Sequence, residues 1–200
     1  MKQSIGAQPL LYPTPVLVVC TFDGVGKPNA MTVAWGGICC SKPPCVSISL
    51  RKATYSYHHI LERKAFTINI PGDKYLSHAD YFGSVSGKNE DKFLTTGLTP
   101  VKSTLVDAPY IDEFPMILEC HMIHSIEIGL HTQFIGEILD IKADDSCLDS
   151  EQVPLIERIR PVLYAPGVRA YYGIGNKLAD AYSTKKEKFT EKVVEGKHLK

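Results

Sequence analysis

The stretch that decides the fold is PVLVVCTFDGVGKPNAMTVAW, residues 15–35. Its first part, Pro15–Thr21, is rich in β-branched residues, which favour extended strands. Asp23-Gly24 is a strong turn signal, and Asn29–Cys40 then reads as a second strand, interrupted by Gly36-Gly37. Paired glycines inside a strand indicate a bulge, a bend or the close approach of another backbone. The stretch therefore predicts two strands separated by a turn.

A helix is expected between the next two strands. Cys45–Leu50 alternates apolar and small polar residues, and Ala65–Ile70 is a second short β-rich run. Between them, Thr54 stands where it can cap a helix over Tyr55–Lys64, whose apolar face would hold Tyr57, Ile60 and Leu61. Shorter helical pieces and an intervening loop follow, at Leu76–Phe82, Asp91–Thr95 and Gly83–Gly87.

The second half of the chain predicts a long hairpin. Phe114–Ile128 and Thr132–Ala143 are extended runs joined at Gly129–His131. Period-two alternation places one set of side chains on a common face: Met116, Leu118, Cys120 and Met122. A last short strand is expected over Val162–Tyr164.

These segments predict a mainly β fold, a β-barrel with a few helices, because the spacing of the strands suits a barrel. We expect one domain over residues 1–175. Residues 176–200 are polar and Lys-rich, and are expected to form a helical or loose C-terminal extension.

Charge and hydropathy narrow the classes of partner. Lys+Arg and Asp+Glu both number 22, so the formal net charge is zero. This balance argues against nucleic acid or an anionic membrane as the main partner. No run approaches the roughly 18 apolar residues that a membrane span needs, and the first residues lack the apolar run of a signal peptide. The expectation is a soluble, cytoplasmic protein.

The six cysteines are too few for a disulfide-stapled scaffold in a chain of 200 residues. Most lie in apolar runs, so we expect buried thiols. No metal site is expected, because Cys39-Cys40 and Cys45 lack C-x-x-C spacing. His121 and His124, three residues apart on a strand, should point to opposite faces.

Two familiar motifs are excluded. Gly83–Lys88 (GSVSGK) has three residues between its glycines and Asn89 after its lysine, so it does not match a phosphate-binding P-loop. The G-x-S-x-G elbow of serine hydrolases does not occur in the sequence. We assign no catalytic acid, base or nucleophile.

Polar and basic residues gather at strand ends instead. Asn29–Thr32 opens one strand, and Ser47–Lys52 closes another directly before the helix that starts after Thr54. A helix N-terminus offers free N–H donors, and two cations beside it complete an anion site. The ligand expected there has a flat, polar-edged ring and a phosphate. Solvated turn charges at Arg51 and Lys52 are the alternative, and the residues alone leave both interpretations open.

Six segments together resemble the flavoredoxin branch of the flavin reductase-like family. They are YPTPVLVVCT, GKPNAMTVAW, PPCVSISLRKATYSY, INIP, SGKNEDKF and GLTPV, in this order, within a resemblance that covers about Tyr12–Tyr172. The resemblance implies a split β-barrel that binds FMN. It also implies a homodimer with flavin sites near the subunit interface.

By matching position, the resemblance assigns three groups of residues to the flavin. The isoalloxazine ring and ribityl chain would be lined by Asn29, Ala30, Met31 and Thr32. The phosphate would lie among Ser49, Leu50, Arg51, Lys52 and Thr54. The loop residues that close over the flavin would be Ser86, Gly87 and Lys92, and Trp35 is expected near the ring.

Three functions follow as alternatives. The first is an electron-transfer flavoprotein with noncovalent FMN, which exchanges electrons with a redox protein. The second is an oxidoreductase of the flavin reductase type, which takes electrons from NAD(P)H. The third is a barrel that binds a ligand or haem without redox turnover, for which His121, His124 and His131 are the conceivable haem ligands. The sequence leaves the electron donor and acceptor open.

Overall fold

The hairpin expected from residues 15–35 is present in the computed structural model, which describes residues 1–183. β2 (Leu17–Phe22) pairs antiparallel with β3 (Pro28–Val33). The single strand expected over Asn29–Cys40 is wrong, because the chain leaves the sheet after β3 and re-enters as β4 (Gly36–Ser41). Gly36 is needed at this point, since an added Cβ would lie 2.8 Å from the carbonyl oxygen of Ser47.

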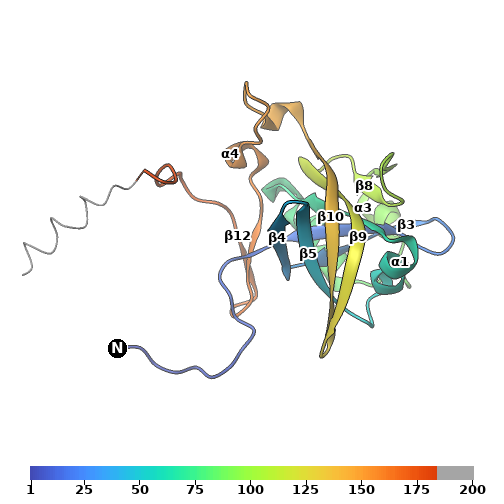
Figure 1. Ribbon diagram of the computed structural model, residues 1–200, viewed down its shortest axis with the longest axis horizontal. Helices are drawn as coiled ribbons and strands as arrows, with labels where there is room; N and C mark the ends of the chain where they lie inside the picture. Colours follow the sequence, from blue (N-terminus) through green and yellow to red (C-terminus); the bar gives the residue numbers. More distant parts are fainter. Residues whose placement is uncertain (184–200) are drawn as a thin grey trace, which may run out of the picture.

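The main sheet has seven strands in the order β3-β2-β6-β9-β10-β5-β4, with every neighbouring pair antiparallel. The other four strands are β5 (Pro44–Arg51), β6 (Ala65–Ile70), β9 (Met116–Ile128) and β10 (His131–Ala143). β3 and β4 follow each other in the chain but form opposite edges of this order, so the sheet curls into a barrel (Figure 1). This confirms the mainly β barrel.

One apolar core fills the barrel. Val19, Ile48, Phe66 and Phe134 are among its fully buried side chains. The common face expected on β9 is confirmed, because its four members lie in this core or pack against it: Met116, Leu118, Cys120 and Met122.

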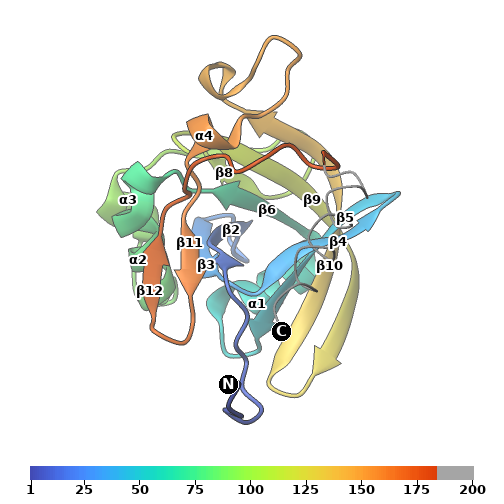
Figure 2. The same ribbon diagram turned by 90° about the vertical axis from the view of Figure 1, so that its left-hand side faces the viewer.

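A second core lies on the outer face of β2 and β3. α2 (Leu76–Ser84) and α3 (Lys92–Thr96) cover this face, with Phe82 and Phe93 packed in one cluster with Val18 (Figure 2). β2 is therefore buried on both faces, which explains the continuous apolar run Leu17–Cys20. The same packing holds the α2–α3 loop, residues 85–91, next to β3.

α1 (Tyr55–Arg63) confirms the helix between β5 and β6, with Tyr57 and Ile60 buried. Thr54 occupies the N-cap position, but its predicted capping role is wrong. Its hydroxyl Oγ1 donates to the carbonyl oxygen of Arg51 at 2.8 Å and accepts no hydrogen bond from the first turn. The N–H groups of that turn thus receive no side-chain cap from Thr54.

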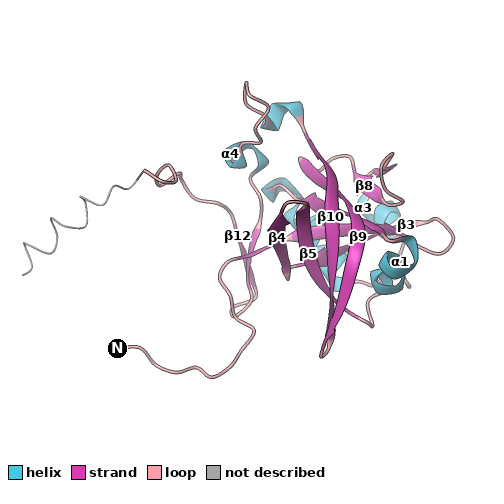
Figure 3. Ribbon diagram, viewed as in Figure 1, coloured by secondary structure: helices cyan, strands magenta, loops and turns pink. Residues whose placement is uncertain are grey.

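The remaining elements are short (Figure 3). A three-stranded sheet contains β1 (Thr14–Pro15), β11 (Leu163–Ala165) and β12 (Ala170–Tyr172), and a pair contains β7 (Pro100–Lys102) and β8 (Pro109–Ile111). α4 (Ile156–Ile159) and the 3-10 turns Asp73–Tyr75 and Asp145–Cys147 complete the assignment. In the extension predicted over 176–200, residues 184–200 lie outside the described part. None of the helices in the described part is long and apolar enough to cross a membrane.

Two expectations about side-chain placement are corrected. Cys39 and Cys40 are exposed, unlike the other four cysteines, because β4 is an edge strand. His121 and His124 share a face, because an irregularity in the β9–β10 register places them opposite Glu137 and Ile135. Even so, residues 1–183 contain no group of three His, Cys, Asp or Glu side chains suited to a metal ion.

Candidate functional site

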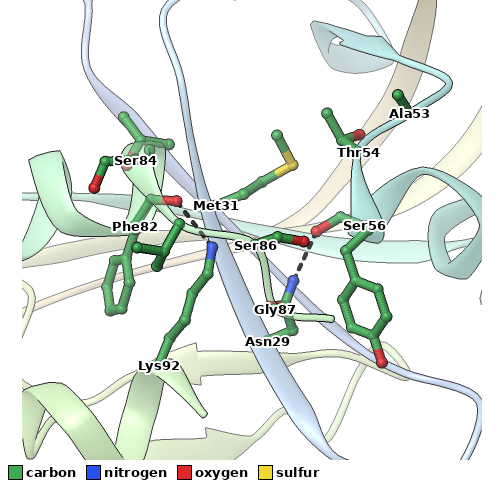
Figure 4. Close-up of a pocket in the computed structure, with 14 residues that line it drawn as sticks. Asn29, Met31, Ala53, Thr54, Ser56, Phe82, Ser84, Ser86, Gly87 and Lys92 are labelled. Carbon is green, nitrogen blue, oxygen red and sulfur yellow. Dashed lines mark hydrogen bonds between the residues drawn. The ribbon is translucent and has the colours of Figure 1, made fainter. Parts of the chain in front are cut away.

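A pocket of about 260 Å³ lies between β3, the N-terminus of α1 and the loop that follows α2 (Figure 4). β3 contributes Asn29, Met31 and Thr32, and α3 contributes Lys92. The start of α1, the C-terminal end of α2 and the α2–α3 loop supply the rest: Ala53, Thr54, Tyr55, Ser56, Phe82, Gly83, Ser84, Val85, Ser86 and Gly87.

A second pocket of about 240 Å³ adjoins the first and shares Met31, Thr32 and Thr54 with it. Its remaining lining is Val33, Ala34, Trp35, Ser49, Leu50, Arg51 and His131. The Trp35 and His131 rings pack at 4.7 Å between centroids. The two pockets form one elongated depression, called the cleft below, which suits a long, flat ligand.

The loop crosses β3 at very short range. A Cβ added to Gly87 would lie 1.9 Å from Asn29 Oδ1 and 2.9 Å from Tyr55 Cδ1, so only glycine fits. Asn29 is held in turn, because its Nδ2 donates to Ser56 Oγ at 2.8 Å. The α2–α3 loop, β3 and the start of α1 are therefore in direct contact at this end of the cleft.

Lys92 is the one cofactor candidate whose charge is buried, with 4% of its surface exposed. Its Nζ donates to the carbonyl oxygen of Ala30 at 2.7 Å. It also donates to the carbonyl oxygen of Phe82 at 2.9 Å (Figure 4). No carboxylate in the described part of the chain lies within ion-pair distance of it. Burial lowers the pKa of Lys92 to about 8. An ammonium placed this way at the wall of the cleft is suited to an electron-rich or anionic group.

A second cationic element lies at the other pocket. Arg51 is exposed and lines it, next to the start of α1. The first turn of α1 contains no acidic residue that would compete for its N–H groups. Together, these features can hold a phosphate.

Ten of the twelve residues predicted for the flavin line the cleft. They are Asn29, Met31, Thr32, Ser49, Leu50, Arg51, Thr54, Ser86, Gly87 and Lys92. Ala30 does not, since its side chain is buried under α2 and α3 and only its carbonyl oxygen is used, by Lys92. Lys52 does not either, because its Nζ pairs with Glu127 Oε1 at 2.7 Å.

The sequence reasoning did not include several other lining residues at the start of α1, at the end of α2 and the beginning of the loop, after Thr32 and at the start of β10: Ala53, Tyr55, Ser56, Phe82, Gly83, Ser84, Val85, Val33, Ala34 and His131. Gly83–Gly87 was predicted as a loop, and its small residues were the available signal that another chain segment or a ligand comes close. His131 was considered as a turn residue and as a conceivable haem ligand, not as part of a flavin site. Its contact with Trp35 depends on the curl of the sheet.

A third pocket of about 250 Å³ touches the first one at Thr32, Gly83 and Ser84. Its aromatic wall comes from Tyr164 and Tyr171, near the C-terminal end of the described chain. Tyr171 donates to Asp80 Oδ1 at 2.8 Å, and burial together with this carboxylate raises the pKa of Tyr171 to about 12. This pocket offers room for a second ring beside the cleft.

Comparison with known proteins agrees with the fold. The flavoredoxin of Desulfovibrio vulgaris (Miyazaki F) is 56% identical, with a TM-score of 0.88 over 92% of this chain and 98% of that one. The flavoredoxin from Methanosarcina acetivorans is 26% identical, with a TM-score of 0.87 over 94% and 98% of the two chains. An uncharacterized protein of Archaeoglobus fulgidus is 32% identical over 71% of this chain and 80% of its own length. Residues 10–173 match the family described as "Flavin reductase like domain", and the chain therefore belongs to the flavin reductase-like family.

Proposed function

We propose that this protein binds FMN noncovalently in the cleft and transfers electrons through it. The observation that carries this proposal is Lys92, a buried ammonium at the cleft wall whose hydrogen-bond partners among residues 1–183 are two carbonyl oxygens. The flavoredoxin from Desulfovibrio vulgaris, at 56% identity, supports the same reading. When bound, FMN supplies the redox chemistry, and the protein supplies binding, orientation and electrostatics.

The residues of the cleft fit such a ligand. Arg51 and the uncapped first turn of α1 would hold the phosphate. Met31 and Thr32 would line the ring along β3, with the end of α2 and the start of the α2–α3 loop, residues 83–87, on the other side. Lys92 would stabilise negative charge on the ligand, which favours the reduced form and raises the reduction potential.

The first experiment is an absorption spectrum of the purified protein, followed by heat release and identification of the chromophore. FMN in the released fraction would support the proposal. FAD in its place would correct the cofactor, and a colourless protein that binds neither added flavin would refute the function. A Lys92→Met variant that binds FMN as tightly as the natural chain would refute the role of the ammonium.

A flavin reductase fed by NAD(P)H is the second candidate. The third pocket favours it, because Tyr164 and Tyr171 flank a space that shares four residues with the cleft: Thr32, Ala34, Gly83 and Ser84. Rapid anaerobic mixing with NADH or NADPH distinguishes the two. Bleaching of the flavin band on mixing supports the reductase. A band that stays unchanged, but is bleached by a reduced redox protein, supports electron transfer between proteins.

We also propose a homodimer. Apolar side chains next to the cleft are exposed in the single chain, among them Trp35 at 41% and Ile38 at 68%. A second copy that covers this surface would shield the flavin from water. Light scattering after gel filtration tests the assembly, and a monomer at all concentrations would refute it. A cytoplasmic location remains part of the proposal, to be tested by cell fractionation.

A further inference from the structure

The tip of the β4–β5 hairpin gathers three thiols that the flavin cleft does not use. Figure 2 shows this hairpin in light blue, reaching away from α2 and α3. Cys40 on β4 lies directly opposite Cys45 on β5, one pair before the turn-closing pair Ser41 and Pro44. A shift in the register between Ile38 and Cys40 leaves Cys39 without a partner on β5.

The opposed pair has the spacing that a disulfide requires. Cβ atoms of directly opposed residues in an antiparallel pair lie about 4.5–5.5 Å apart. A disulfide joins Cβ atoms about 3.5–4.5 Å apart, so a shift of about 1 Å is enough. The end of the hairpin can make this shift, because Pro44 has no N–H to donate to the ladder and, among the described strands, none pairs with the outer side of β4.

The two cysteines differ in accessibility. Cys40 is exposed, whereas Cys45 is buried, with 3% of its surface exposed. Burial, and then the neighbouring Cys40, Cys39 and Glu137, raise the pKa of the Cys45 thiol. Thiolates are the attacking species, so this difference assigns the first attack to Cys40 and the closing step to Cys45.

We propose that Cys40 and Cys45 form a redox-active dithiol that reacts with small disulfides and closes a cross-strand bridge at the hairpin tip. The Cys40 thiolate attacks one sulfur of a disulfide RSSR, forming a mixed disulfide and releasing one RS⁻. Cys45 then attacks the Cys40 sulfur and releases the second RS⁻. The protons of the two cysteines end on the two released thiols, so that one dithiol and one RSSR give one protein disulfide and two RSH.

The test uses the reduced full-length chain, an excess of oxidised glutathione and alkylation of the remaining thiols after denaturation. The number of alkylated cysteines per chain should fall from six to four, and the product should contain no disulfide between two chains. Peptide mapping of this same product should locate the bridge between Cys40 and Cys45. Mapping needs no variant, so the test does not depend on how the variants fold.

Variants assign the two steps. Cys45→Ser should stop at a glutathione adduct on Cys40, and Cys40→Ser should form no bridge. Cys39→Ser is the matched control and should still lose two thiols. Six free thiols after treatment, a bridge that needs Cys39, or a disulfide between two chains would each overturn the proposal. The reaction requires no flavin, so its failure would leave the proposed function untouched.

Discussion

Two lysines on the barrel are held in opposite ways. Lys142 on β10 donates to the carboxylates of Glu119 and Asp140, and Glu119 is completely buried. Lys92 on α3 is itself buried, and within the described part of the chain it donates to two carbonyl oxygens and pairs with no carboxylate. The Lys142 ammonium therefore neutralises a charge that the fold has buried. The Lys92 ammonium is instead buried at the wall of a cleft, with no counter-charge among the described residues. An ammonium of the second kind is costly to the fold and therefore marks a binding site.

The same substitution should separate the two roles. Lys142→Met leaves the Glu119 carboxylate buried and unpaired, and its Oε1 already lacks a hydrogen-bond partner among the described residues. Breaking such a pair should cost about 3 kcal/mol of stability. Chemical denaturation measures the loss, and flavin affinity should stay unchanged. An equally stable variant would contradict the structural role of Lys142.

Lys92→Met should give the reverse pattern. Loss of a charged hydrogen-bond donor facing the ligand removes about 2 kcal/mol, or about 30-fold in FMN affinity. Stability of the flavin-free protein should hold or rise, because an uncompensated buried charge is removed. Fluorescence titration and denaturation of the same sample provide both values. Wild-type affinity together with a large loss of stability would assign Lys92 to structure.

The pH dependence of FMN binding sharpens the comparison. Because burial lowers the pKa of Lys92 to about 8, the ammonium is present below that pH and affinity should be constant there. Above it, binding must take up a proton, so affinity should fall about tenfold by pH 9. The same group should make the flavin-free protein more stable as pH rises from about 8 toward the value of about 10.4 for an unfolded lysine. Titrations across pH should show the fall in affinity for the natural chain and not for Lys92→Met.

Arg51 and Lys52 provide the smallest contrast, between two exposed neighbours. Arg51 lines the cleft, whereas Lys52 pairs with Glu127. Arg51→Ala should weaken FMN binding about fivefold, equivalent to about 1 kcal/mol for an exposed charge. Lys52→Ala should change it less than twofold. If both variants lose the same FMN affinity in the same titration, Lys52 contributes to phosphate binding and this distinction is wrong.

Much of the local structure was predictable. β6 begins and ends at the predicted residues, and the β9–β10 hairpin and α1 agree to within a few residues. Each has a strong periodic pattern and clear turn signals, which depend only on neighbours in the chain. The split of Asn29–Cys40 into two strands was not predictable in this way, because it depends on pairing with another segment. β3 pairs with β2, whereas β4 pairs with β5.

The composition of the cleft was predictable only in part. Ten of the twelve residues that the family resemblance assigned to the flavin line the cleft, Lys92 among them. The resemblance could not tell that Arg51 lines the cleft and Lys52 does not, because the two residues are adjacent in the chain. Their side chains differ in direction because of tertiary contacts. Lys52 finds Glu127, far away in the chain, and leaves the cleft.

The sequence by itself determined which segments form strands and helices, which faces are apolar, and which polar residues stand at strand ends. These properties follow from periodicity and from turn chemistry, and both act over a few residues. Only the tertiary structure decided that Lys92 meets the carbonyl of Ala30 without a carboxylate nearby, and that Trp35 packs on His131. Such contacts join residues far apart in the chain, and they exist only because the sheet curls and α3 packs across β3.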